Sequence, residues 1–484
     1  MSNQKSQFMT EDWWAVWLGL LVFVLGLGSL AGADLLGWVV KPAIWVDLGK
    51  AVSPASKGFA AMGGFLSLFV TYIALLAAFS VGAAALGWRV SKFMYGFTVI
   101  FWLTYCCMIA GHYATIATMS PGDIKKFNLA WSLKLTGEAG LIIALLLGLF
   151  ISNFVPKFAQ SLREAARPEW YIKTAIVILG AGLGVKAVAA MGLATAVMFR
   201  GLCAIIEAYL IYWALVYWMA RKWFGFSREW SAPLASGISI CGVSAAIATG
   251  AAIRARPIVP VMVSSLVVIF AVVELLILPF LAQQFLYTEP LVAGAWMGLA
   301  VKTDGAAVAS GQIVDSLIRA KALTAQGINY QAGWILSTAT TVKIFIDIFI
   351  GVWAFILAVI WCSVIEHRPG ERVSAVEIWN RFPKFIIGYA LTFLIMLWIC
   401  WGAPKDLMAR ASAGIGNGDI LRSLFFALCF FSIGLVSNFR KLWEEGIGRL
   451  AVVYIVALFG FIIWIGLIIS WIFFHGIHPP IVGA

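Results

Sequence analysis

The segment SGISICGVSAAIATG, from Ser236 to Gly250, lies in a chain of long apolar runs, yet it contains three glycines, three serines and a cysteine. Glycine lowers helix stability, and serine hydroxyls can bond the backbone groups that an unwound turn leaves free. The segment therefore predicts a membrane-embedded helix that is interrupted between about Ser239 and Ser244. The freed amides of a half-helix would favour an anionic group there. The alternative is that the small residues let two helices pack closely.

The composition places this segment in a membrane protein. Of the 484 residues, 62% are hydrophobic and 12% are charged, and the mean hydropathy is +0.96. Open sheet edges cannot cross lipid, so these values predict an all-α polytopic protein. The polar start MSNQKSQFMTEDWW leads into a long apolar run without a cleavage site, which favours a first spanning helix over a removed signal peptide. We expect an inner (plasma) membrane location.

Apolar runs bounded by charges, Pro or Gly predict about 13 transmembrane helices. The expected spans are 13–31, 62–87, 93–118, 138–155, 171–190, 194–220, 232–251, 257–282, 291–311, 333–361, 380–402, 420–437 and 447–474. The connections between them, such as 312–330, are too short to fold as soluble domains.

The charged residues divide the chain unequally. The first three spans contain no Lys, Arg, Asp or Glu at mid-span, whereas later spans do. We therefore expect residues 1–130 to form a three-helix membrane extension and residues 131–484 to form a transporter core. The stretches ILGAGLGVKAVAAMG (178–192) and FFSIGLVSNFRKLWEEG (430–446) resemble each other weakly, which indicates either duplicated halves or coincidence.

Other function classes find little support in the sequence. The net charge of +12 comes from short Lys and Arg clusters between apolar runs, which suit membrane lipid rather than nucleic acid. The seven cysteines form no metal-type cluster, so we expect neither a metal nor a cofactor. Signatures of enzymes are absent, and the chain is not expected to be one.

A second segment, WMGLAVKTDGAAVASG (296–311), places Lys302, Thr303 and Asp304 near the middle of an expected span. Ionisable groups at that depth are costly and are usually functional. Residues two apart on a helix point to different faces, so Lys302 and Asp304 could pair locally only if the helix breaks, at Gly305.

A third segment, TATTVKIFIDIFIG (338–351), carries Lys343 and Asp347 four residues apart on one helix face. That spacing permits either mutual neutralisation or contact between Lys343 and a substrate. Glu207 and Glu274 are further carboxylates within expected spans. They, with Asp347, are candidates for binding a coupling ion, or they are partners between helices.

The chain from about Thr136 to Ser470 resembles the YeiH-type family of proposed sulfate exporters. The resemblance rests on GLIIALLLGLFISN (140–153), on the two weakly similar stretches above, and most specifically on SGISICGVSAAIATGAAIRA (236–255). It implies an inverted-repeat transporter with broken helices, similar in fold to bile-acid symporters and sodium/proton antiporters. It also implies that the substrates are sulfur oxyanions.

The resemblance implies roles for single residues as well. Those in the ligand-cradling region would be Ser239, Cys241, Gly242 and Ser244, and Lys343 would match a basic residue of the family. One departure is that Lys302 and Thr303 stand where the family carries a His-Glu pair, which puts proton coupling and the family substrate in doubt.

Together these observations predict a secondary transporter that exports a small anion, namely sulfate, sulfite or a sulfonate. Its expected partners are the anion, membrane lipid, Na⁺ or H⁺ as coupling ion, and a second copy in a homodimer. One alternative is a non-transporting membrane scaffold or sensor subunit. Another is a sodium-coupled organic anion symporter.

Overall fold

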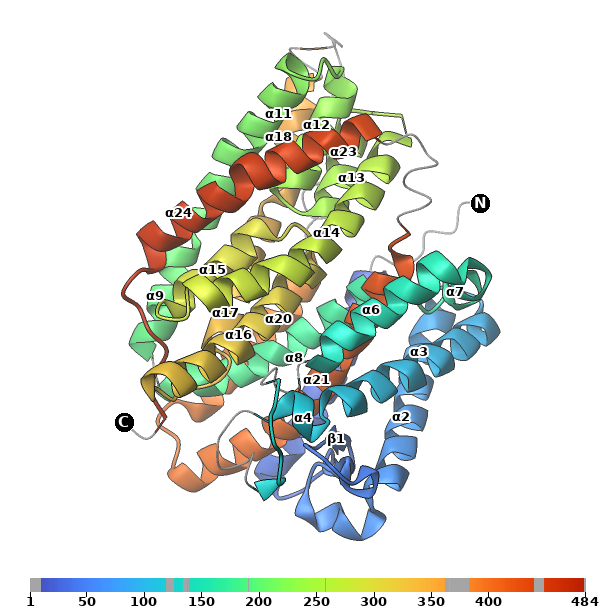
Figure 1. Cartoon of the computed structure of the whole chain (residues 1–484), viewed down its shortest axis with the longest axis vertical. Helices are drawn as coiled ribbons and strands as arrows, with labels where there is room; N and C mark the ends of the chain where they lie inside the picture. Colours follow the sequence, from blue (N-terminus) through green and yellow to red (C-terminus); the bar gives the residue numbers. More distant parts are fainter. Residues whose placement is uncertain are drawn as a thin grey trace. The chain divides into compact units, whose positions relative to one another are not determined.

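The computed structural model of the chain contains two compact units (Figure 1). Unit 1 contains 1–191 and 384–436, and unit 2 contains 192–383 and 437–484. The first 130 residues belong to unit 1 together with later helices, and the division into an extension and a transporter core stays a prediction. The structure describes residues 10–118, 126–133, 137, 139–189, 191–256, 258–361, 365, 383–438 and 448–482.

Unit 1 is mainly helical. Its helices are α1 (Glu11–Leu27), α2 (Gly64–Ala85), α3 (Val90–Gly111), α4 (Ala114–Ala117), α6 (Ala139–Phe154), α7 (Pro156–Leu162), α8 (Pro168–Ala189), α20 (Phe385–Cys400) and α21 (Lys405–Val436). One feature departs from the all-α expectation, because β1 (Val40–Pro42) and β2 (Val52–Pro54) pair as a short antiparallel sheet. This sheet lies in the connection between the first two helices.

Small residues let the helices of unit 1 approach closely. A Cβ atom added to Gly148 on α6 would overlap the carbonyl oxygen of Phe431, and one added to Gly434 on α21 would overlap that of Leu145. Such close approach is typical of helix packing in membranes, where lipid removes most of the hydrophobic drive for association. Of the two weakly similar stretches, 178–192 falls mostly on α8, whereas only 430–436 of the second lies on α21 and its part after residue 438 is outside the described residues.

Unit 2 contains the segments singled out by the sequence. Its elements are α9 (Met191–Gly201), α10 (Cys203–Ile205), a π-helical segment (Ile206–Tyr212), α11 (Trp213–Lys222), α12 (Arg228–Ser239), α13 (Gly242–Ala252), α14 (Ile258–Phe285), α15 (Pro290–Ala300), α16 (Asp304–Gln326), α17 (Trp334–Ile348), α18 (Ile350–Ile360), α23 (Gly448–Ala457), a second π-helical segment (Leu458–Ile462) and α24 (Ile463–Phe474). The connection expected at 312–330 is instead mostly helix, because α16 continues to Gln326.

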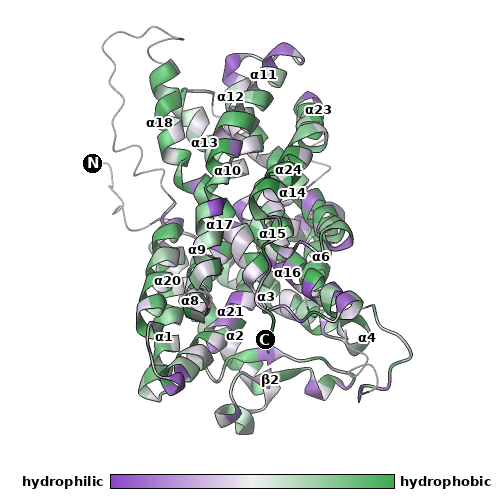
Figure 2. Cartoon of the chain, turned by 90° about the vertical axis from the view of Figure 1, so that its left-hand side faces the viewer, coloured by the Kyte–Doolittle hydropathy of each residue, from purple (hydrophilic) through white to green (hydrophobic). Residues whose placement is uncertain are grey.

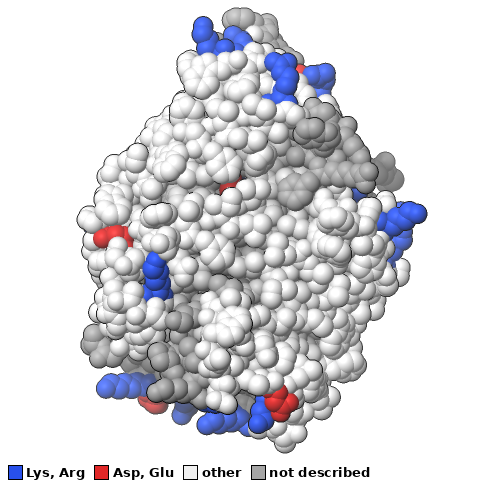
Figure 3. Space-filling model, in the orientation of Figure 1, with Lys and Arg blue, Asp and Glu red and all other residues white. Residues whose placement is uncertain are grey.

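Within the described residues, 8 helices are long and apolar enough to cross a membrane, or up to 9 if the pair α6 and α7, bent by 118°, is one span. Two of the expected spans are divided into the shorter pairs α12/α13 and α15/α16. The count of 13 therefore stays a prediction. Most helices in Figure 2 are largely green, the colour of hydrophobic residues. The face drawn in Figure 3 carries few charged side chains. Both features suit a multi-pass membrane protein.

Candidate functional site

The first interrupted helix breaks where the sequence predicts. Helix α12 ends at Ser239, and α13 begins at Gly242. Between them Ile240 (φ −108°, ψ −87°) and Cys241 (φ −138°, ψ 119°) leave the helical conformation. The predicted interruption between Ser239 and Ser244 is confirmed. The small residues also let helices pack closely, because a Cβ atom added to Gly237 or Gly242 would overlap Val263 or Val267 of α14.

The second interrupted helix breaks slightly earlier than expected. Helix α15 ends at Ala300, the next three residues are not helical, and α16 begins at Asp304. The break therefore precedes Gly305. The N-cap residue is Thr303, whose hydroxyl oxygen accepts a hydrogen bond from the Ala306 N–H at 3.2 Å. This threonine starts a new helix in the middle of the unit.

The two breaks contact each other. The Gly242 N–H donates to the Lys302 carbonyl oxygen at 2.7 Å, and the Cys241 thiol donates to Asp304 Oδ1 at 2.8 Å. A Cβ atom on Gly242 would overlap Val267 and would lie 3.3 Å from the Thr303 methyl group. Glycine at this position therefore makes room mainly for Val267 of α14, and the second break also lies close to it.

Two buried lysines bind the carbonyl groups at these breaks. Lys343 Nζ on α17 donates to the Ile240 carbonyl oxygen at 2.7 Å, and Lys302 Nζ donates to the carbonyl oxygen of Leu299. Carbonyl groups at the C-terminal end of a helix lack intrahelical partners and carry the negative end of its dipole. Each lysine thus stabilises one half-helix. The sequence allowed a local ion pair between Lys302 and Asp304, but the Lys302 ammonium instead binds the Leu299 carbonyl group.

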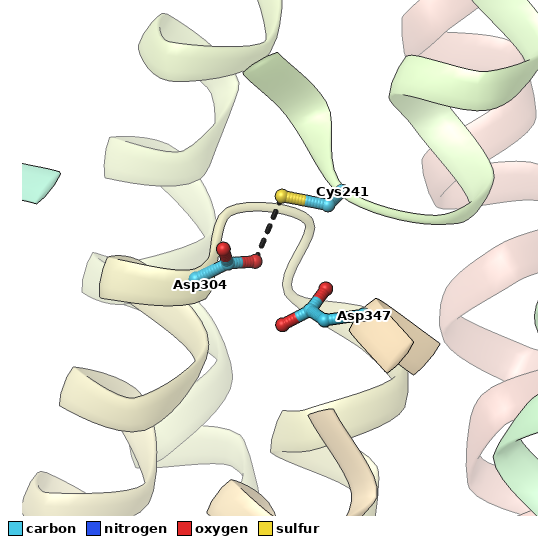
Figure 4. A group of neighbouring side chains, drawn as sticks. All are labelled: Cys241, Asp304 and Asp347. Atoms are coloured by element: carbon cyan, nitrogen blue, oxygen red, sulfur yellow. Dashed lines mark hydrogen bonds between the residues drawn. The ribbon is translucent and has the colours of Figure 1, made fainter. Parts of the chain in front are cut away.

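One thiol and two carboxylates form a group near Lys343, and Figure 4 shows these three side chains. Ligand atoms of Cys241, Asp304 and Asp347 all lie within 4.8 Å of one another. Lys343 Nζ lies 3.7 Å from Asp304 Oδ1, and these two side chains are only 2% and 3% exposed. Lys343 thus pairs with Asp304, and the charge of Asp347, the partner expected from the sequence, also acts on it. The three ligand atoms are close enough together to hold a small cation, with the ammonium balancing part of their charge.

A second polar group surrounds Lys302. Its backbone N–H donates to Glu274 Oε2 at 3.1 Å, and its Nζ lies 4.4 Å from the centre of the Tyr212 ring. The Tyr454 hydroxyl lies 3.4 Å from Glu274 Oε1. Glu207 is fully buried. The sequence analysis missed both tyrosines, because an aromatic residue in an apolar helix has no distinctive pattern.

Two expected site residues, Ser239 and Ser244, are not among the described contacts of these groups. Ser239 is buried at the end of α12, and its hydroxyl has no hydrogen-bond partner among the residues that the structure describes. The backbone of Ser244 lies in α13, and its side chain is outside the described part. The other expected residues of unit 2 lie either where the two breaks contact each other or around Lys302.

The two interrupted helices contact each other inside an apolar helical unit. This arrangement is typical of polytopic membrane proteins, in which non-helical backbone is surrounded by protein. The chain belongs to the family described as Conserved hypothetical protein 698, whose model matches residues 127–453. Most of the first 130 residues precede that match.

Two relatives of the chain carry the name of a membrane protein. The chain is 43% identical over 477 residues to a UPF0324 membrane protein of Nitrosomonas europaea, covering 98% of this chain and 97% of the relative. It is 29% identical over 428 residues to a UPF0324 membrane protein of Nitratidesulfovibrio vulgaris, covering 86% and 65%. An uncharacterized protein of Archaeoglobus fulgidus is 56% identical over 165 residues, which are 30% of this chain and 88% of that one. The chain is therefore a membrane protein of this family.

Proposed function

We propose that the chain is a secondary transporter that exports a small anion, a sulfur oxyanion such as sulfate, sulfite or a sulfonate. The observation that carries the proposal is the contact between two buried helix breaks, joined by the hydrogen bond from Gly242 to Lys302. Non-helical backbone within a membrane is tolerated only where protein or a water-filled cavity surrounds it. In many transporters such half-helices bind the substrate and the coupling ion.

Two features support an anion as the substrate. Lys302 and Lys343 bring two ammonium groups to the breaks, and both side chains are buried. The first turns of α13 and α16 also point the positive ends of their dipoles at this region. An entering anion would compete with the carbonyl groups of Leu299 and Ile240 for the two lysines.

The organisation of unit 2 supports duplicated halves. Its N-terminal half contains the π-helical segment 206–212 and the break at 240–241, and its C-terminal half contains the break at 301–303 and the π-helical segment 458–462, besides π-helical residues at 361 and 365. We therefore propose an inverted repeat, about 13 spans and an inner-membrane location.

One observation favours a second candidate, a sodium-coupled organic anion symporter. The ligand atoms of Cys241, Asp304 and Asp347 are arranged closely enough to attract a cation. A non-transporting scaffold or sensor subunit is the remaining alternative, and it would show no substrate-dependent flux.

Binding measurements test the proposal. Lys302→Met keeps most of the stem volume and removes the charge, so it should sharply weaken affinity for sulfate, sulfite and methanesulfonate in calorimetry. Lys302→Arg should retain part of the affinity, because it keeps a cation. Lys222→Met, on an exposed residue at the end of α11, is the matched control. Wild-type affinity in Lys302→Met would contradict the proposal, and a requirement for Na⁺ would favour the symporter.

A further inference from the structure

Glu207 is a buried carboxyl group beside the Tyr212 hydroxyl, which donates its proton to the Ile462 carbonyl oxygen. It is 0% exposed, and neither of its oxygen atoms has a hydrogen-bond partner within the described part of the chain. A carboxylate removed from water without donors is strongly destabilising. Such a group is stable only as the neutral acid or beside a cation.

The local backbone around Glu207 is unusual. It belongs to the π-helical segment 206–212, and the hydroxyl of Tyr212, the last residue of this segment, donates to the Ile462 carbonyl oxygen at 2.7 Å. Ile462 is the last residue of the second π-helical segment, 458–462. π-Helical turns are rare and often occur at functional sites. These two π-helical segments of unit 2 therefore meet beside one buried acid.

Gly466 leaves space at this meeting point. A Cβ atom on Gly466 would lie 2.7 Å from the Tyr212 hydroxyl, 3.4 Å from Glu207 Oε1 and 3.6 Å from Leu299 Cβ. The acid, the tyrosine and the end of α15 thus surround a single point. Because residue 466 has no side chain, these groups can come close to one another.

The neighbouring cation is Lys302. Its Nζ lies over the ring of Tyr212 and donates to the Leu299 carbonyl oxygen, so it contacts two of the three residues around Gly466. The charged groups that act on Lys302 are Glu207, Lys343 and Glu274. The other titratable groups that interact with Glu207 are Tyr212 and Cys203, and Tyr454 lies beside Glu274.

We propose that Glu207 binds the proton that couples transport, with Lys302 as its alternate partner. When Glu207 carries the proton, Lys302 stays on the Leu299 carbonyl group. When the proton leaves the carboxyl oxygen for water, the carboxylate attracts the ammonium away from Leu299. That movement uncovers the C-terminal end of α15 and changes the break that contacts Gly242. The inference rests on the proposed function and adds the coupling ion to it.

Infrared spectroscopy tests the proton site without any substrate. In a pH titration of purified wild-type protein, the carboxylic acid C=O band of a buried acid should disappear as the pH rises. Glu207→Gln should lack this band component. Glu229→Gln, which changes an acid in an ion pair with the mostly exposed Arg256, should keep it. A spectrum of Glu207→Gln that retains the whole titrating band would overturn the proposal.

Flux measurements test the coupling. In proteoliposomes, a pH gradient should drive anion accumulation by the wild type. Glu207→Gln should lose this accumulation and keep anion exchange in the absence of a gradient. Equal gradient-driven accumulation in the variant would overturn the coupling role. If the wild type shows the band but moves no anion, the proposed function fails while the proton site stands.

A measurement on the unchanged chain covers the case in which Glu207→Gln does not fold. An apolar carbodiimide reacts with protonated buried carboxyl groups, and mass spectrometry locates the labelled peptide. Labelling of Glu207 that falls as the pH rises supports the proposal. Labelling of other buried acids such as Glu274, with none on Glu207 at any pH, would overturn it.

Discussion

The substitution Lys343→Met tests whether this lysine stabilises the contact between the two helix breaks. The lysine ammonium lies 2.7 Å from the Ile240 carbonyl oxygen and 3.7 Å from Asp304 Oδ1, in a region almost closed to solvent. Methionine keeps most of the stem and leaves the carboxylate without this cation. Removing one partner of a buried ion pair costs about 3–5 kcal/mol. We expect a loss of that size in the free energy of unfolding.

A double-mutant cycle separates the ion pair from general packing. Unfolding in mixed micelles, followed by tryptophan fluorescence, is measured for wild type, Lys343→Met, Asp304→Asn and the double variant. Because Asp304→Asn removes the uncompensated charge, the double variant should be more stable than the sum of the single losses, by about 0.5–3 kcal/mol. Lys222→Met is the control and should have little effect, since that side chain is exposed. Strictly additive losses, or a loss below about 1 kcal/mol in Lys343→Met, would refute this reasoning.

Two further substitutions test packing in each unit. Gly242→Ala should destabilise unit 2 by about 1–3 kcal/mol, because its Cβ overlaps Val267, whereas Gly416→Ala, with no atom within 4 Å, should be neutral or stabilising. Equal melting temperatures for the two variants would contradict the close approach at Gly242. In unit 1, Asp12→Asn removes the 2.8 Å ion pair between α1 and Lys173 of α8, and the partly exposed site should lose about 1 kcal/mol in chemical unfolding. An Asp12→Asn variant as stable as wild type would show that this pair does not fix α1.

The sequence predicts those parts of the site that depend on residue type. Crowded glycines and serines around Cys241 indicate a break because they weaken a helix locally, and α12 does end at Ser239. Lys302 and Asp304 mark the second segment because charges are costly in lipid. These predictions depend on residue types within a few positions of one another, so they do not require knowledge of which helices pack together.

Partners that come from tertiary packing could not be predicted. Lys302 binds the Leu299 carbonyl group rather than Asp304, because the carbonyl at a helix C-terminus is a backbone group that any residue provides. Asp304 pairs with Lys343, which is 39 positions away in sequence. The segment IEAYLIY (206–212) has the composition of an ordinary apolar helix, so its π-helical turn has no sequence signature.

Substrate flux is the most direct test of the proposed transporter. Purified protein is reconstituted into liposomes loaded with radiolabelled sulfate or sulfite, and efflux is compared between wild type, Lys302→Met and empty liposomes. The account predicts efflux of at least one sulfur oxyanion by wild type, and a strong reduction in Lys302→Met. Efflux at the level of empty liposomes for every sulfur oxyanion, from protein that is folded and correctly inserted, would contradict it.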